Sequence, residues 1–278
     1  MQRQLSRAFP SVLSAAVLVF ATYCLAQSPV AADTTSKPVT SSNSADASAV
    51  IRAAIAALGG ERAIASLRNV HATGTIALPE EDSKRSLAFT WDDDISGPKL
   101  EFRDEVRDGP NVRVFVSGHG SPAQLVNGKR QSLFAYVADA APPLHLPAVV
   151  LFRRRNGGAL KNTIVAQEVS DGKAVVHVRL AIETGSPADV LQVQDWYIEQ
   201  GTGLPLRVDY RVPSTVDALT FEDAQAAFSD FRNVDGVYFP FHIEVSQNGK
   251  HTSSVIIDSI STNETISPAL FETSGGAQ

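Results

Sequence analysis

Histidines and clustered carboxylates are the side chains from which hydrolytic or metal chemistry would be expected in this sequence. The six histidines are His71, His119, His145, His177, His242 and His251. None of them stands in an HExxH motif or a comparable ligand spacing, so the sequence predicts no metal site. His177 and His242 fall on the polar faces of predicted strands, and we interpret both as solvated surface residues.

Two short motifs resemble functional loops only in part. Residues 118–121, Gly-His-Gly-Ser, do not match the G-x-S-x-G nucleophile motif, and we interpret them as a hairpin turn. Asp92, Asp93 and Asp94 lack the glycine and the distal glutamate of a calcium loop, which favours a solvated strand end. We therefore expect no enzymatic activity and no cofactor. An exported hydrolase is an alternative, and it would depend on His119 and Ser121.

The composition is that of a globular protein with a sizeable core. The chain has 278 residues, of which 44% are hydrophobic and 19% charged, and this excludes disorder of the whole chain. The formal net charge of -6 provides no basic surface for phosphates, so we expect no nucleic acid partner. A single uncharged apolar stretch approaches bilayer length, which excludes a membrane protein with several spans.

The N-terminus has the pattern of a secretory signal peptide. Arg3 and Arg7 precede an apolar stretch over residues 12–23, and small residues follow up to Ala26. This stretch is shorter than the roughly 20 residues that cross a bilayer, so we place cleavage near Ala26 and expect no stable span in the mature chain. Cys24 is a poor site for a lipid anchor, because a bulky tyrosine precedes it. We expect a periplasmic or secreted protein.

Three segments follow from these patterns: a signal peptide over residues 1–26, a disordered linker over 27–44 and one domain over 45–273. The linker is rich in Ser, Thr, Ala and Pro. In the domain, apolar residues three and four apart predict helices over 46–58 and 61–67. A mid-chain helix is predicted over 148–155, and we interpret its three final arginines as a solvated last turn rather than an anion-binding patch.

Elsewhere in the domain apolar and polar residues alternate, which predicts strands. Residues 237–245 are the clearest case, because every second side chain there is large and apolar. One-sided alternation is typical of an antiparallel sheet with one dry face, and a sheet of this size curls around whatever covers that face. The predicted fold class is mainly β (α+β). We expect a single large curved antiparallel sheet or unclosed β-barrel, with the N-terminal and mid-chain helices in its concave face.

Several segments resemble the LolA/LolB-like superfamily of periplasmic lipoprotein-binding proteins, particularly its outer-membrane lipoprotein-sorting type. The matching segments are ALGGERA at residues 57–63, NVHATGT at 69–75, WYIE at 196–199, TGLPLR at 202–207 and FSDFRNVDGVYFPF at 228–241. The resemblance covers most of the predicted mature chain. It implies an unclosed barrel whose helices close an interior that holds acyl chains. In the LolA-type carrier a buried arginine helps to keep this lid shut, and Arg62 and Arg68 lie in the corresponding region.

The resemblance implies a non-enzymatic periplasmic carrier that holds lipoprotein acyl chains or another lipid in a lidded hydrophobic cavity. The alternative is an envelope-stress or regulatory protein of the RseB-like type, which would use the same half-barrel to bind an envelope protein. Plain core packing is the alternative interpretation for each residue expected to line the cavity. These residues are Leu87, Phe89, Trp91, Phe102, Leu206, Val208, Tyr210, Phe239, Phe241 and Ile243.

Overall fold

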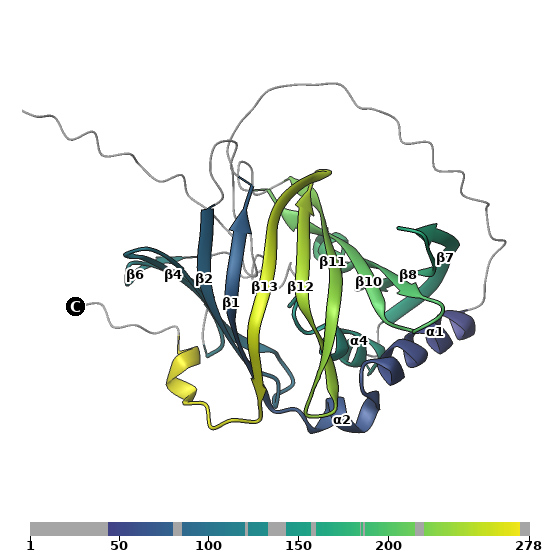
Figure 1. Cartoon of the computed structure of the whole chain (residues 1–278), viewed down its shortest axis with the longest axis horizontal. Coiled ribbons are helices and arrows are strands. Elements are labelled where there is room, and N and C mark those ends of the chain that lie inside the picture. The colour runs from purple at the N-terminus through teal and green to yellow at the C-terminus, as the bar shows by residue number, and fades with distance from the viewer. Residues whose placement is uncertain are drawn as a thin grey trace, which may run out of the picture.

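The computed structural model describes residues 44–79, 85–119, 122–132, 143–156, 160–183, 185, 187–214 and 220–272. Within these residues, one antiparallel sheet and three α-helices form the fold (Figure 1). The predicted signal peptide lies outside the described residues. So does the predicted linker, except for Ser44, which begins helix α1. The domain boundaries therefore stay predictions.

Thirteen strands of the described chain form a single sheet, in the order β6-β5-β4-β3-β2-β1-β13-β12-β11-β10-β9-β8-β7. The strands are β1 Asn69–Leu78, β2 Arg85–Asp94, β3 Glu101–Asp108, β4 Asn111–Ser117, β5 Ala123–Val126, β6 Lys129–Ser132, β7 Leu160–Ser170, β8 Lys173–Ile182, β9 Gln194–Glu199, β10 Pro205–Pro213, β11 Phe221–Val234, β12 Val237–Gln247 and β13 Lys250–Thr262. Strands β6 and β7 are the two edges and lie far apart in Figure 1, so the sheet is unclosed.

Burial alternates along the strands and creates the dry face that the sequence predicts. In β1, half-buried and buried residues alternate strictly over all ten positions. Residues directly opposite each other in an antiparallel pair point to the same face. Ile76 is opposite both Leu87 and Val255, and Val208 is opposite Trp196. We call the face that carries these side chains the inner face and the other the outer face.

Three helices pack on the inner face: α1 Ser44–Ala57, α2 Gly60–Ser66 and α4 Pro147–Asn156. Their apolar side chains belong to the same buried cluster as the inner face of the sheet. The buried residues that the helices and the α1–α2 joint contribute are Ala47, Ile51, Ala54, Ile55, Leu58, Ile64, Ala148, Val149, Val150 and Leu151. The structure thus confirms the fold class, a mainly-β curved sheet with N-terminal and mid-chain helices.

The joint between α1 and α2 requires glycine. Gly59 has φ 121° and Gly60 has φ 83°, which L side chains rarely adopt. A Cβ atom on Gly59 would lie 2.2 Å from the carbonyl oxygen of Gly236, in the turn between β11 and β12. Next to it, the Tyr238 N–H donates a 3.0 Å hydrogen bond to the Leu58 carbonyl. The helical arm therefore sits directly on the backbone of that turn.

Two short 3-10 helices complete the described chain. The C-terminal one is η2 Pro268–Phe271, which begins at a proline. It places Phe271, which is 1% exposed, next to Gly118, where a Cβ would lie 2.7 Å from the Phe271 Cβ. The other, η1 Pro187–Gln192, contacts β8 and β10 and was not predicted.

Candidate ligand-binding site

Eight of the ten residues predicted to line a cavity lie in one buried cluster on the helix-covered side of the sheet. They are Leu87, Phe89, Trp91, Val208, Tyr210, Phe239, Phe241 and Ile243, all less than 9% exposed. Within the cluster the rings of Phe89 and Trp91 stack at 4.0 Å, and those of Trp196 and Phe228 at 6.1 Å. The side chains of α1, α2 and α4 cover these residues, so ligand lining stays a proposal beside core packing.

The other two predicted lining residues lie outside that cluster. Phe102 is half-buried on β3, and its ring stacks on Phe115 of β4 at 5.3 Å. Leu206 is half-buried and lies at a register shift in the β9–β10 ladder. Pro205 pairs with Ile198 there, and the next pair begins at position 207, so Leu206 has no partner on β9. An extra residue at such a bulge breaks the two-residue alternation. The strict period assumed from the sequence therefore does not hold at Leu206.

The end of α4 is fastened to the sheet rather than solvated, which corrects the interpretation of its three arginines. The Arg153 guanidinium donates to the carbonyls of Ile95 at 2.6 Å, Gly97 at 2.9 Å and Pro98 at 3.4 Å. These carbonyls belong to the loop after β2. One half-buried cation thus holds the loop and the helix together through backbone acceptors.

The next two arginines fasten α4 to other neighbours. Arg154 donates to the Gln192 carbonyl at 2.6 Å and to its side-chain oxygen at 3.3 Å, and burial lowers the pKa of Arg154 to about 10. Arg155 forms an ion pair with Glu61 of α2. Arg62 and Arg68, in the region where the resemblance placed a latch, are exposed. Among the described helices, the half-buried arginines therefore lie on α4, and their only sequence signal was the run of three arginines.

A buried polar group lies among the apolar residues of the inner face. The loop before α4 brings His145 to Asp93 of β2, with 2.5 Å between His145 Nε2 and Asp93 Oδ2. The two residues are 2% and 1% exposed. Asp92 points to the outer face and pairs with His71 at 2.7 Å, while Asp94 caps the backbone N–H of Ser96. The three aspartates are therefore not a solvated strand end, because two of them are buried and paired.

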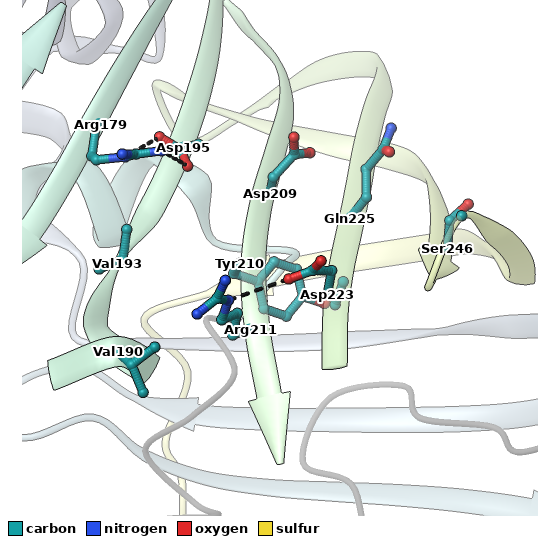
Figure 2. Close-up of a pocket in the computed structure, with 12 residues that line it drawn as sticks. Arg179, Val190, Val193, Asp195, Asp209, Tyr210, Arg211, Asp223, Gln225 and Ser246 are labelled. Carbon is teal, nitrogen blue, oxygen red and sulfur yellow. Dashed lines mark hydrogen bonds and ion pairs between the residues drawn. The ribbon is translucent and has the colours of Figure 1, made fainter. Parts of the chain in front are cut away.

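A pocket of about 460 Å³ lies on the outer face, beside η1. Figure 2 shows its polar side chains in a row across neighbouring strands. The row is Arg179, Asp195, Asp209, Gln225 and Ser246 on β8, β9, β10, β11 and β12. Arg179 donates two 2.9 Å hydrogen bonds to Asp195, so these charges already neutralise each other. Apolar residues, Val190, Val193, Tyr210 and Ala224, also line the pocket, so polar and apolar groups share its wall.

His177 lies beside this row and is less solvated than the sequence predicted. Its side chain is 12% exposed, its Nε2 is 3.0 Å from Asp195 Oδ1, and its ring stacks on Tyr197 at 4.4 Å. Burial, together with the charge of Asp209, raises the pKa of Tyr197 to about 12. The Arg207 guanidinium also lies over the Tyr197 ring, with 3.6 Å from its Cζ to the ring centroid. This arrangement is a packed polar surface.

Solved structures show which fold this is. A domain from Vibrio parahaemolyticus named for outer membrane lipoprotein sorting matches with 10% identity and a TM-score of 0.55, over 82% of this chain and 97% of its own. A DUF1329 family protein from Desulfovibrio piger matches with 14% identity and a TM-score of 0.53, over 81% and 97%. The chain has a LolA-like fold. No protein-family model matches the sequence, and no curated protein matches it either.

The LolA-like fold agrees with the resemblance that the sequence showed. A LolA superfamily protein from Nitrosomonas europaea is also matched, with 11% identity and a TM-score of 0.46, over 82% of this chain and 97% of its own.

Within the described residues, no group of three or more His, Cys, Asp or Glu could hold a metal ion. The hydrolase alternative depends on two residues. His119 forms a β-bridge with Glu272, and Ser121 lies outside the described residues.

Proposed function

We propose that this protein is a non-enzymatic periplasmic carrier that binds acyl chains of lipoproteins or other lipids on its inner face. The observation that supports this proposal is a large, mainly apolar face that, among the described residues, is covered by three short helices and the loop before α4. We call α1, α2 and α4 together the helical lid. A face closed by a second sheet would be fixed, whereas separate helices can move as units. The outer-face pocket mixes apolar side chains with charged ones such as the Arg179–Asp195 pair, so it offers no continuous apolar surface.

The free energy needed to lift α1 and the free energy gained by burying a guest acyl chain are of similar size. Lifting α1 exposes Ile51, Ile55 and Leu58, which are at most 2% exposed. Fully burying one such side chain contributes about 1.5–3 kcal/mol, so the three together cost roughly 4–9 kcal/mol to expose. An acyl chain gains about 0.8 kcal/mol per buried CH₂, and about a dozen methylenes would return roughly 10 kcal/mol. A guest chain can therefore replace the contacts of the lid.

Hydrogen bonds join α1 to the sheet near both of its ends. At the start of α1 the Asn162 amide of β7 donates to the Ser48 hydroxyl at 3.0 Å. At its end the Leu58 carbonyl accepts from Tyr238. Each neutral hydrogen bond contributes about 1 kcal/mol net. These contacts position the closed lid without making it permanent.

Export is part of the same proposal. The predicted signal peptide, cleaved near Ala26, would deliver the domain over residues 45–273 to the periplasm. In the part of the chain that the structure describes, none of the helices has the length and apolar character needed to span a bilayer.

A reversible disulfide between the lid and the sheet tests the proposal. Ser48→Cys with Asn162→Cys joins α1 to β7, and the only native cysteine, Cys24, is absent from the predicted mature chain. We expect the oxidised protein to lose binding of a fluorescent fatty acid, and reduction with dithiothreitol to restore it. Ser48→Cys alone is the matched control and should bind in both states.

Native mass spectrometry of the protein purified from a bacterial periplasm provides the second readout. We expect a co-purifying lipid on the wild-type chain and none on the protein that carries the disulfide. Equal binding of the fatty acid by the oxidised and reduced double variant would show that guests do not enter beneath α1. A wild-type protein that binds neither the probe nor a lipid would refute the carrier function.

A further inference from the structure

Four polar side chains on the inner face have buried atoms without hydrogen-bond partners among the described residues: Ser253 on β13, and a group of three that lie together. Trp91 and Asp93 point to this face from β2, and His145 reaches it from the loop before α4. The rings of Trp91 and His145 are 4.5 Å apart. Trp91 Nε1, Asp93 Oδ1 and His145 Nδ1 are all buried, and none has a hydrogen-bond partner among the described residues. We call these three residues the polar cluster.

The free atoms form a specific set of donors and acceptors. The indole N–H of Trp91 can only donate, and a carboxylate oxygen of Asp93 can only accept. His145 Nδ1 donates or accepts according to its tautomer, because Nε2 is engaged with Asp93. Unpaired polar atoms are rare in buried surroundings because they have lost their hydrogen bonds to water. A guest that both accepts from Trp91 and donates to Asp93 would satisfy this set.

The inner face around the polar cluster is more polar than the rest. Asp104, 8% exposed, lies opposite Trp91 on β3, and Gln124, 4% exposed, lies opposite Phe115 on β5. The corresponding surface of the opposite half is mainly apolar, with Val178, Trp196, Val208, Ala226 and Phe228 on β8 to β11, and its buried Gln194 already accepts a hydrogen bond from the Trp196 indole N–H. The inner face thus has a polar end and an apolar end, as an amphiphilic guest would require.

We propose that the polar cluster binds the neutral head of an acylated guest, an amide or hydroxyl group that carries both a donor and an acceptor. This inference rests on the carrier function proposed above. The guest tail then extends toward Trp196 and Phe228, and its head replaces the missing partners of Trp91 and Asp93. An anionic head is disfavoured, because its charge would lie against the Asp93 carboxylate.

Two probes with the same tail test this proposal. Oleamide has N–H groups that can donate to Asp93, whereas methyl oleate has none. We expect oleamide to bind about tenfold more tightly, as one hydrogen bond to a charged group predicts. Binding is measured by displacement of a fluorescent fatty acid. In Asp93→Leu with His145→Phe, which leaves no lone buried charge, the ratio should fall to about one while methyl oleate still binds.

Trp91→Phe tests the indole donor of Trp91 independently of the Asp93 acceptor. It removes the indole N–H together with one of the two rings, and it should weaken both probes by the same factor, which preserves their ratio. Equal binding of the two probes by the wild-type protein would overturn the role of the polar cluster and leave the carrier function intact. Failure of both probes to bind would count against the carrier function itself.

A third probe identifies the source of the head group. An N-palmitoylated peptide carries the same donor and acceptor in its amide as a free fatty amide does. If its binding depends on Asp93 and His145 as that of oleamide does, the site fits the acyl amide of a lipoprotein. If only oleamide shows this dependence, the site fits a free lipid. Both results support a neutral amide-type head, and insensitivity of all three probes to the double variant would refute it.

Discussion

Replacing Gly59 with alanine should destabilise the joint between α1 and α2 more than any exposed change on these helices. The added Cβ would lie 2.2 Å from the Gly236 carbonyl oxygen and 3.0 Å from the Val237 Cα. Both are backbone atoms, so no side-chain rotation relieves the contact. Either the helical arm or the β11–β12 turn must move.

The expected loss has two parts. An L residue in a left-handed backbone conformation costs about 1–2 kcal/mol. Moving the turn also breaks the hydrogen bond from Tyr238 to Leu58, about 1 kcal/mol, and loosens Leu58 itself, which is fully buried and contributes about 1.5–3 kcal/mol. With partial relaxation, we expect Gly59→Ala to lower the free energy of unfolding by about 3–5 kcal/mol.

Urea unfolding followed by the fluorescence of Trp91 and Trp196 measures this change, because both indoles are at most 2% exposed. Gly60→Ala is the matched control, since Gly60 also has a positive φ but no atom within 4 Å of its Cβ position. Gly60→Ala should lower the free energy of unfolding only by the cost of the left-handed backbone conformation, about 1–2 kcal/mol. If the two variants were equally stable, the contact with the β11–β12 turn would contribute nothing and the reasoning would fail.

Three further changes follow from the structure. Arg153→Ala removes the donor to three carbonyls and should lower the free energy of unfolding in urea by about 1–3 kcal/mol, while Arg52→Ala, exposed on α1, should change it by less than about 0.5 kcal/mol. For Asp195, burial raises the pKa, but hydrogen bonds from a histidine and an arginine outweigh it and the net pKa is lowered. Asp195 therefore stabilises the fold above its unfolded pKa, and this contribution is lost as the pH falls through the lower folded value. Asp195→Asn should flatten the decline of the thermal midpoint in acid, and an unchanged decline would contradict that sign. Val169 is 73% exposed on edge strand β7, so Val169→Lys should reduce self-association in light scattering at high concentration.

The alternation of residue types was sufficient to predict the sheet and which face is dry. Residues 237–245 alternate strictly, and their apolar members Val237, Phe239 and Ile243 are completely buried. Helix periodicity predicted α1, α2 and α4 to within two residues at each end. These features are local, because each depends on the spacing of side chains along one segment.

Features that depend on partners far apart in the chain could not be predicted in this way. Arg153 and Arg154 look like a solvated helix end, because the loop after β2 and Gln192 that accept their hydrogen bonds are remote in sequence. Asp93 and His145 are 52 residues apart, and neither flanking sequence indicates that they meet. Pairing of this kind is set by how the elements pack.

Pro240 of strand β12 shows where a proline can lie within a sheet. A proline in a strand predicts an edge or a bulge, because it cannot donate to a ladder. Strand β12 lies in the interior of the sheet, which is not what an edge predicts. Its ladder with β13 runs from Gln247 to His242, however, so Pro240 lies just beyond it. The rule therefore applies to the local ladder and not to the strand as a whole.

The strand order has a consequence for how the chain can fold. Strands β1 to β6 form one series of successive hairpins and β7 to β13 another, and only the β1–β13 ladder joins the two series in the sheet. That ladder begins with Val70 opposite Thr262, a loop closure of nearly the whole domain. Such a distant contact forms slowly. A chain that emerges from its N-terminus onward therefore cannot complete its sheet until the last strand has appeared, and any truncation before β13 leaves two separate halves with unpaired edges.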